Sequence, residues 1–246
     1  MNINKKLSIV LSIAALLFVT QLHAQLYVGV EGGANNNHII TNTSDKPFFT
    51  YESSYGYSFG LPIRYEFRGL PWFGGIQAIP GFVQKNYRMQ RTGFYSPMYQ
   101  DYQNNYLELP IMAQFRFGGY FNKQQRLYGI LNLGGFGGYW MNGHVKGRAL
   151  SPMDLTNYQE FDEAYTFSTE RDNRFELGAL AGLGVQYMPN KKYVFSIEAR
   201  YTPTLTDQQN AYSENQTARY NDTYGVFVGM QYHLPSLKHN KSKASK

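Results

Sequence analysis

Apolar and polar positions alternate along much of this chain. From Tyr57 to Phe67 every odd position is apolar or aromatic, and the positions between are polar, small or proline. The same period of two recurs in residues 107–117, 175–187 and 193–201. Because successive side chains of a β-strand point to opposite faces, each segment predicts a strand with one apolar and one polar face.

Further segments complete the predicted set of strands. Residues 26–34, 72–87 and 224–234 also alternate, whereas 127–140 is β-like but glycine-rich, so that its facing is ambiguous. The total is about eight strands. Prolines stand inside three of these patterns, where the missing N–H predicts a local bulge or a break in the ladder. They are Pro62, Pro80 and Pro110.

The connections between these strands alternate in length. The short ones are 68–71, 118–125 and 188–191, and the long polar ones are 35–54, 91–102, 148–170 and 206–222. Tight periplasmic turns and long external loops are typical of outer-membrane barrels. The chain is therefore predicted to be all-β, a small closed antiparallel transmembrane β-barrel of about eight strands in an up-and-down meander, with both ends in the periplasm.

A soluble β-sandwich or lipocalin-like barrel would also alternate, with its apolar face inward. Aromatic residues near the strand ends of the apolar face, such as Tyr193 and Tyr201, favour the membrane barrel because they resemble its two interfacial girdles. The composition agrees, with 22 Tyr, 17 Phe and 24 Gly and a mixed set of charges on the polar faces.

The N-terminal segment has the features of a signal peptide. Lys5 and Lys6 precede an apolar run, residues 7–19, that is too short to span a bilayer as a helix, and Ala24 is a small residue suited to a cleavage site. We therefore expect a signal peptide over 1–24, a barrel domain over 25–234 and a basic periplasmic tail over 235–246. The absence of cysteine excludes disulfides and an acylated N-terminal cysteine.

The formal net charge of +6 lies outside the expected barrel. Two of these charges are Lys5 and Lys6, and the other four are tail lysines, so none remains for residues 25–237. A folded nucleic-acid-binding face is therefore not supported.

Residues 105–111 read Asn-Tyr-Leu-Glu-Leu-Pro-Ile, and this segment resembles the PorT-type outer-membrane β-barrel family of Bacteroidetes. Residues 127–135, 176–187 and 196–201 match the same family in order. The resemblance covers nearly all of the expected mature chain and implies a barrel in the outer membrane, surrounded by lipid and lipopolysaccharide. The resemblance associates one branch of the family with protein secretion. A match at the level of the fold does not assign that role to this chain.

The inward polar faces of the predicted strands collect five acids and four bases. They are Glu31, Arg64, Glu66, Lys85, Glu108, Arg116, Glu176, Glu198 and Arg200. In a narrow barrel these side chains share a small interior, where an unpaired charge is costly. We predict that they form a structural network of ion pairs that plugs the lumen. An ion path or a catalytic carboxylate pair is the alternative.

No other motif indicates chemistry. The five histidines form no Ser-His-Asp or metal-ligand spacing, and the glycine run 134–138 lacks the Lys-Ser/Thr of a phosphate loop. We therefore expect no catalytic residues, cofactor, metal or small-molecule substrate. The leading hypothesis is a structural or interaction barrel that displays surface loops. The alternatives are an accessory of a secretion system, with secretion-machine or periplasmic protein partners, and a narrow pore or barrel enzyme.

Overall fold

The computed structural model describes residues 24–41, 48–67, 70–120, 125–151, 157–210 and 217–235. The expected signal peptide (except Ala24) and the expected tail (except Pro235) lie outside the described residues. Within these residues no helix is long and apolar enough to cross a membrane. The described helical structure is a short 3₁₀ turn, η2 (Gly93–Tyr95).

Eleven strands are present in the described residues, and all their pairings are antiparallel. They are β1 (Ala24–Thr41), β2 (Phe49–Gly60), β3 (Ile63–Phe67), β4 (Phe73–Ala78), β5 (Gly81–Arg91), β6 (Tyr99–Tyr120), β7 (Arg126–Leu150), β8 (Tyr158–Ala164), β9 (Phe175–Met188), β10 (Tyr193–Pro203) and β11 (Arg219–Leu234).

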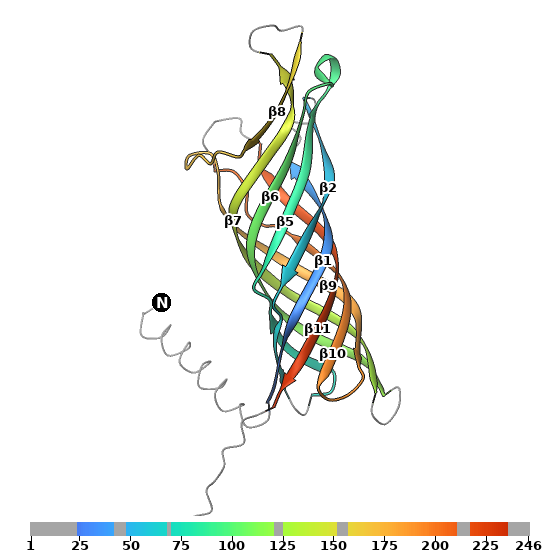
Figure 1. Ribbon diagram of the computed structural model, residues 1–246. Helices are drawn as coiled ribbons and strands as arrows, with labels where there is room; N and C mark the ends of the chain where they lie inside the picture. The colour runs from blue at the N-terminus through green and yellow to red at the C-terminus, as the bar shows by residue number, and fades with distance from the viewer. Residues whose placement is uncertain are drawn as a thin grey trace, which may run out of the picture.

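Eight of these strands close a ring. The order around it is β1, β2, β5, β6, β7, β9, β10 and β11, and the pairing of β11 with β1 closes the barrel (Figure 1). β3 and β4 continue the lines of β2 and β5 toward the periplasmic end, where they bridge β1 to β6. The predicted small, closed meander of about eight strands is therefore confirmed.

The three prolines lie side by side across neighbouring strands. β2 is separated from β3 at Leu61–Pro62, and β4 from β5 at Ile79–Pro80. The carbonyl oxygens of Pro62, Pro80 and Pro110 accept bonds of 2.9–3.0 Å from the amides of Gly29, Leu61 and Ile79, respectively.

The predicted break at Pro110 is found in the ladder and not in the strand. β6 runs without interruption from Tyr99 to Tyr120, but on one side its pairing passes from Ala78↔Ile111 in β4 to Gly81↔Glu108 in β5 and leaves Pro110 without a ladder partner there. In an antiparallel strand the nitrogen and the carbonyl of one residue face the same neighbour. The carbonyl of Pro110 accepts from the Ile79 amide, so its nitrogen faces the Ile79 carbonyl in the segment between β4 and β5. Proline has no N–H to donate to that carbonyl, so one of the two bonds of this pair is missing.

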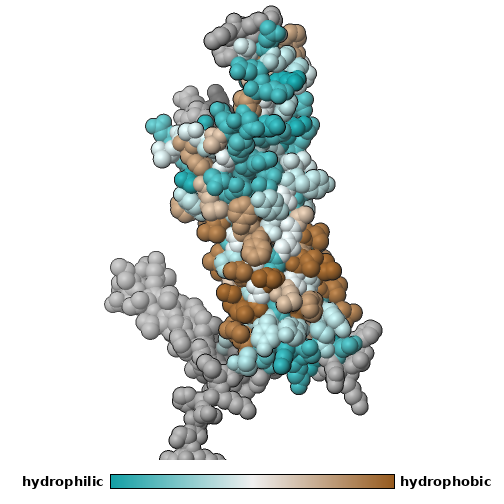
Figure 2. Space-filling view, in the orientation of Figure 1, coloured by the Kyte–Doolittle hydropathy of each residue, from teal (hydrophilic) through white to brown (hydrophobic). Residues whose placement is uncertain are grey.

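The barrel is apolar outside and polar inside. Leu107, Leu109 and Ile111 are about half exposed, whereas Glu108 and Pro110 between them are buried. Figure 2 shows the resulting hydrophobic band across the lower half of the face in view. Ring stacks flank it, such as Trp72 with Phe115 near the periplasmic end and Tyr201 with Tyr224 near the other. The inward–outward assignment is confirmed for the strands with clear alternation.

Several strands extend beyond the predicted ends. β1 reaches Thr41, β7 reaches Leu150, and β8 lies within the segment 148–170 that was predicted as a loop. Outside the membrane both faces of a strand meet polar surroundings, so a paired strand persists without alternating. The upper parts of β2, β5, β6 and β7, with β8, form an extracellular sheet that rises above the band (Figures 1 and 2).

Candidate functional site

The lumen contains three charge clusters, which together hold the nine charged residues expected there. Nearest the periplasmic end, Arg116 makes a bidentate pair with Glu66, with both N–O distances 2.9 Å. Arg64, fully buried, donates to Gln114 Oε1 at 2.8 Å and lies 4.5 Å from the ring centre of Tyr27. Its Nη2 is 3.8 Å from Glu66 Oε2. This cluster has two cations and one carboxylate.

The middle cluster centres on Arg200, which contacts two carboxylates at once. Its Nη1 and Nη2 donate to the two oxygens of Glu31 at 2.5 and 2.8 Å. Its Nη2 and Nε lie 3.0 Å from the two oxygens of Glu198. The guanidinium also covers the ring of Phe227 at 4.4 Å, and all three charged residues are buried. β11 lies between β1 and β10, so this cluster joins strands that are not adjacent.

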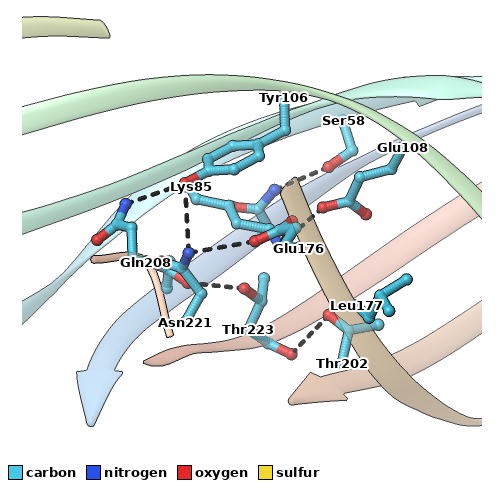
Figure 3. Close-up of polar contacts among 12 residues, drawn as sticks. Ser58, Lys85, Tyr106, Glu108, Glu176, Leu177, Thr202, Gln208, Asn221 and Thr223 are labelled. Carbon is cyan, nitrogen blue, oxygen red and sulfur yellow. Dashed lines mark hydrogen bonds and ion pairs between the residues drawn. The ribbon is translucent and has the colours of Figure 1, made fainter. Parts of the chain in front are cut away.

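The third cluster lies closer to the extracellular end and, like the middle cluster, has one cation and two carboxylates. Lys85 Nζ is 2.7 Å from Glu108 Oε1 and 2.5 Å from Glu176 Oε1. Figure 3 shows these side chains converging with Tyr106, Gln208 and Asn221. Gln208 donates to the Tyr106 hydroxyl at 2.9 Å, and Asn221 donates to Glu176 Oε2 at 3.4 Å. Every carboxylate in the three clusters therefore contacts a cation.

Glycines on neighbouring strands make room for these side chains. Gly138 stands in register between Glu108 and Glu176, and a Cβ there would lie 2.8 Å from Glu176 Cγ and 3.2 Å from Glu108 Cγ. Gly182 stands opposite Arg200, and its Cβ would lie 2.0 Å from Glu198 Oε1. The glycine content of the polar faces thus has a packing reason.

An aromatic layer lies above the third cluster, toward the extracellular end of the lumen. Tyr106 stacks on Trp140 at 5.9 Å between ring centres, and Trp140 stacks on Tyr165 at 5.0 Å. Phe167 packs edge-on against Trp140 at 4.8 Å, and Arg174 lies 4.2 Å above the Phe167 ring. Sequence reasoning missed this layer because Tyr165 and Phe167 follow β8 in a segment predicted as a loop. Their alternation with polar residues was the available signal.

Apolar side chains also pack inside the barrel below the clusters. Tyr27, Met188 and Val194 form a buried apolar group near the periplasmic end, against which Tyr128 packs. A cavity of about 40 Å³ remains between the middle and third clusters, bordered by Glu31, Glu108 and Arg200 among others. Such a volume holds only a few water molecules.

An ordered loop supports the aromatic layer from outside. The Asp172 carboxylate accepts bonds from Arg171 Nε, the Tyr165 hydroxyl and the Ser168 amide, each at 2.8 Å. Burial raises the pKa of Asp172, but these bonds outweigh it and the net pKa is lowered. Burial and the bond to Asp172 raise the pKa of Tyr165.

The described part of the chain has no group of three or more His, Cys, Asp or Glu that could hold a metal ion. Of the histidines, His144 contacts Asp162 on the extracellular sheet, and the His233 ring lies 5.0 Å from that of Tyr27 at the periplasmic end.

A family model described as outer membrane protein beta-barrel domain matches residues 20–210. No curated protein matches the chain. Among solved structures, the chain is similar to Ail, the attachment invasion locus protein of Yersinia pestis, at 17% identity and a TM-score of 0.39, covering 85% of this chain and 98% of Ail. It is also similar to OprG from Pseudomonas aeruginosa, at 14% identity and a TM-score of 0.45, covering 86% of this chain and 97% of that one. Neisserial surface protein A gives 11% identity and a TM-score of 0.40, covering 85% and 97%.

Proposed function

Since the chain belongs to the outer membrane protein β-barrel domain family and is located in the outer membrane, we propose that it is a barrel with a plugged lumen and a structural or interaction role. The observation that supports the plugged lumen is the set of buried charge clusters across it. Its outward apolar band contacts membrane lipid, and its surface-exposed extracellular part is the site of interaction.

The energetics of buried charge support the plug. An ion that passes through would have to displace Arg200 from Glu31 and Glu198, and Lys85 from Glu108 and Glu176. Breaking one buried pair by removing a partner costs about 3–5 kcal/mol. The aromatic layer at Trp140 adds a second barrier above them. A pore would instead need a continuous polar path through the barrel.

The PorT-type motif supports a role in the fold. Tyr106 accepts from Gln208, Glu108 pairs with Lys85, and the Pro110 carbonyl accepts from Ile79. Because these groups face the lumen or the sheet, the motif gives no surface for a secretion partner. The secretion-accessory hypothesis therefore depends on the extracellular part or on the proposed basic periplasmic tail, 235–246. We also propose that the signal peptide, 1–24, is removed, which mass spectrometry of the mature N-terminus would check.

The test of the plug is conductance. Purified full-length protein is inserted into planar bilayers, and its current is compared with that of Lys85→Ala/Arg200→Ala, which opens two clusters. We expect no steady current from the wild type. A steady, ohmic wild-type current would overturn the plug and favour the pore.

A further inference from the structure

The extracellular sheet ends in an open strand. Within the described ranges, β8 pairs with β7 alone along its whole length. The other edge of this sheet is the short upper part of β2, residues 49–53, which pairs with β5 alone before β2 joins β1 in the barrel. Six of its seven residues are exposed, and Phe161 is half-buried over Gly147. The outer edge of such a strand presents backbone N–H and C=O groups that another extended segment can pair with.

Charges alternate in sign along one row across this sheet. In register, Glu52 of β2 faces Arg88 of β5, Arg88 faces Asp101 of β6, Asp101 faces Lys146 of β7, and Lys146 faces Asp162 of β8. Arg88 and Asp101 form a bidentate pair at 2.6 and 2.9 Å. Opposite charges on directly opposed residues stabilise strand pairing, and like charges oppose it. A further strand added beside β8 would continue this alternation if it placed a basic residue opposite Asp162.

The open edge is acidic along its length. β8 carries Glu160, Asp162 and Glu163 and no basic residue. Glu160 reaches Arg148 at 3.1 Å and Asp162 contacts His144, yet the side chains of Glu160 and Asp162 remain more than half exposed. The edge can therefore accept further positive charge.

This pattern disfavours a second copy of the chain as the partner. Pairing β8 with β8 would set Glu160, Asp162 and Glu163 against one another. Pairing β8 with the other end of the row would set Asp162 near Glu52. Both arrangements oppose like charges.

We propose that the free edge of β8 binds an extended basic peptide segment by strand addition. Basic side chains of the segment lie opposite Glu160 and Asp162, and an apolar side chain lies opposite Phe161. Because side chains alternate along strands, the segment has a basic–apolar–basic core. The proposal rests on the interaction role proposed above and names the chemistry of the partner.

The probe is a labelled seven-residue peptide with a Lys-Val-Lys core and Thr flanks, titrated against the full chain in detergent micelles by fluorescence anisotropy. Binding should weaken roughly tenfold for Glu160→Gln/Asp162→Asn/Glu163→Gln. The matched control, Glu52→Gln/Glu170→Gln, removes acids from elsewhere on the extracellular part and should bind as the wild type does.

A second peptide keeps the charges but has proline at alternate positions, so it cannot pair with a strand edge. We expect it to bind at least tenfold more weakly. Equal binding of both peptides would overturn strand addition, and equal binding to the acid-depleted variant would overturn the charge complementarity. No binding to the wild type, or dimerisation through β8 in sedimentation, would also overturn the proposal. A closed lumen in the conductance test would leave the proposed plug intact in each case.

Discussion

At the scale of single residues, the packing of charged side chains in the lumen depends on glycines, which leave the space that these side chains occupy. Gly182 lies beside the Glu198 carboxylate, and a Cβ there would come within 2.0 Å of Glu198 Oε1. Gly182→Ala should therefore displace Glu198 from Arg200 and cost about 1–3 kcal/mol. The measurement is the temperature at which the folded gel band of the unboiled protein disappears. Gly119→Ala is the control, because a Cβ at Gly119 meets nothing within 4 Å.

A second variant tests the ion pairs of the middle cluster by removing their shared cation, Arg200. Arg200→Met leaves Glu31 and Glu198 without their shared cation, so we expect a loss of about 3–5 kcal/mol in the same assay. Adding Glu198→Gln removes one orphaned charge and should recover part of the loss. Strictly additive losses in the double variant would argue against the pairing.

Asp172 gives the extracellular loop a pH dependence. Its folded-state pKa lies below the ordinary value of 3.8. Its bonds therefore stabilise the loop fully above that value and are lost as the pH falls through the lowered pKa. We expect proteolysis of 165–174 by pepsin to increase sharply only below about pH 4. Asp172→Asn should remove this step, and an unchanged acid profile in that variant would assign it to another group.

At the scale of the element, the period-two pattern contains most of the information about facing. On β10, Ile197 is exposed on the lipid side and Ser196 points inward. Ile197→Arg should cost about 2–4 kcal/mol and impair assembly. Ser196→Asn is the paired control, since Gly229 lies opposite and leaves room. Equal assembly of both variants, measured by gel shift after refolding, would refute the facing of β10.

The sequence predicted which side chains point inward or outward better than it predicted where strands end or which side chains are in contact. Alternation identified the membrane-spanning parts of β6, β9 and β10 because lipid and lumen differ in polarity there. β7 remained ambiguous, since glycines such as Gly134 and Gly137 have no side chain to mark a face. The alternation along β1 and β10 predicted that Glu31 and Arg200 both point into the lumen. Their contact depends in addition on the register and curvature of three strands. A linear pattern does not contain that information.

At the scale of the whole molecule, two regions meet at the extracellular surface of the membrane. The barrel wall and its lumen clusters are closed on every side by ring pairing, whereas the sheet above them is open at β8. The surface above the apolar band is largely hydrophilic (Figure 2). Glu52, Lys146 and Asp162 of the extracellular sheet are exposed. This division suggests that the extracellular hairpin of β7 and β8 can change without loss of the barrel.

The last prediction removes that hairpin. Lys146 and Asp162 stand directly opposite in the β7–β8 ladder, so a two-residue Asn-Gly turn can replace residues 147–161 and join them. The deleted part contains Phe161 and the exposed Arg148–Glu160 pair, and it leaves Trp140, Tyr165 and all three charge clusters in place. Since exposed pairs contribute at most about 1 kcal/mol, the shortened chain should assemble and melt close to the wild type.

The same variant separates the two regions by function. It should remain non-conducting in planar bilayers, because the aromatic layer and the clusters persist, and it should lose binding of the Lys-Val-Lys peptide, because Glu160 and most of the β8 edge are gone. A conducting shortened barrel would show that the hairpin, rather than the lumen, forms the barrier. Failure to assemble would show that the extracellular sheet and the barrel fold as one unit.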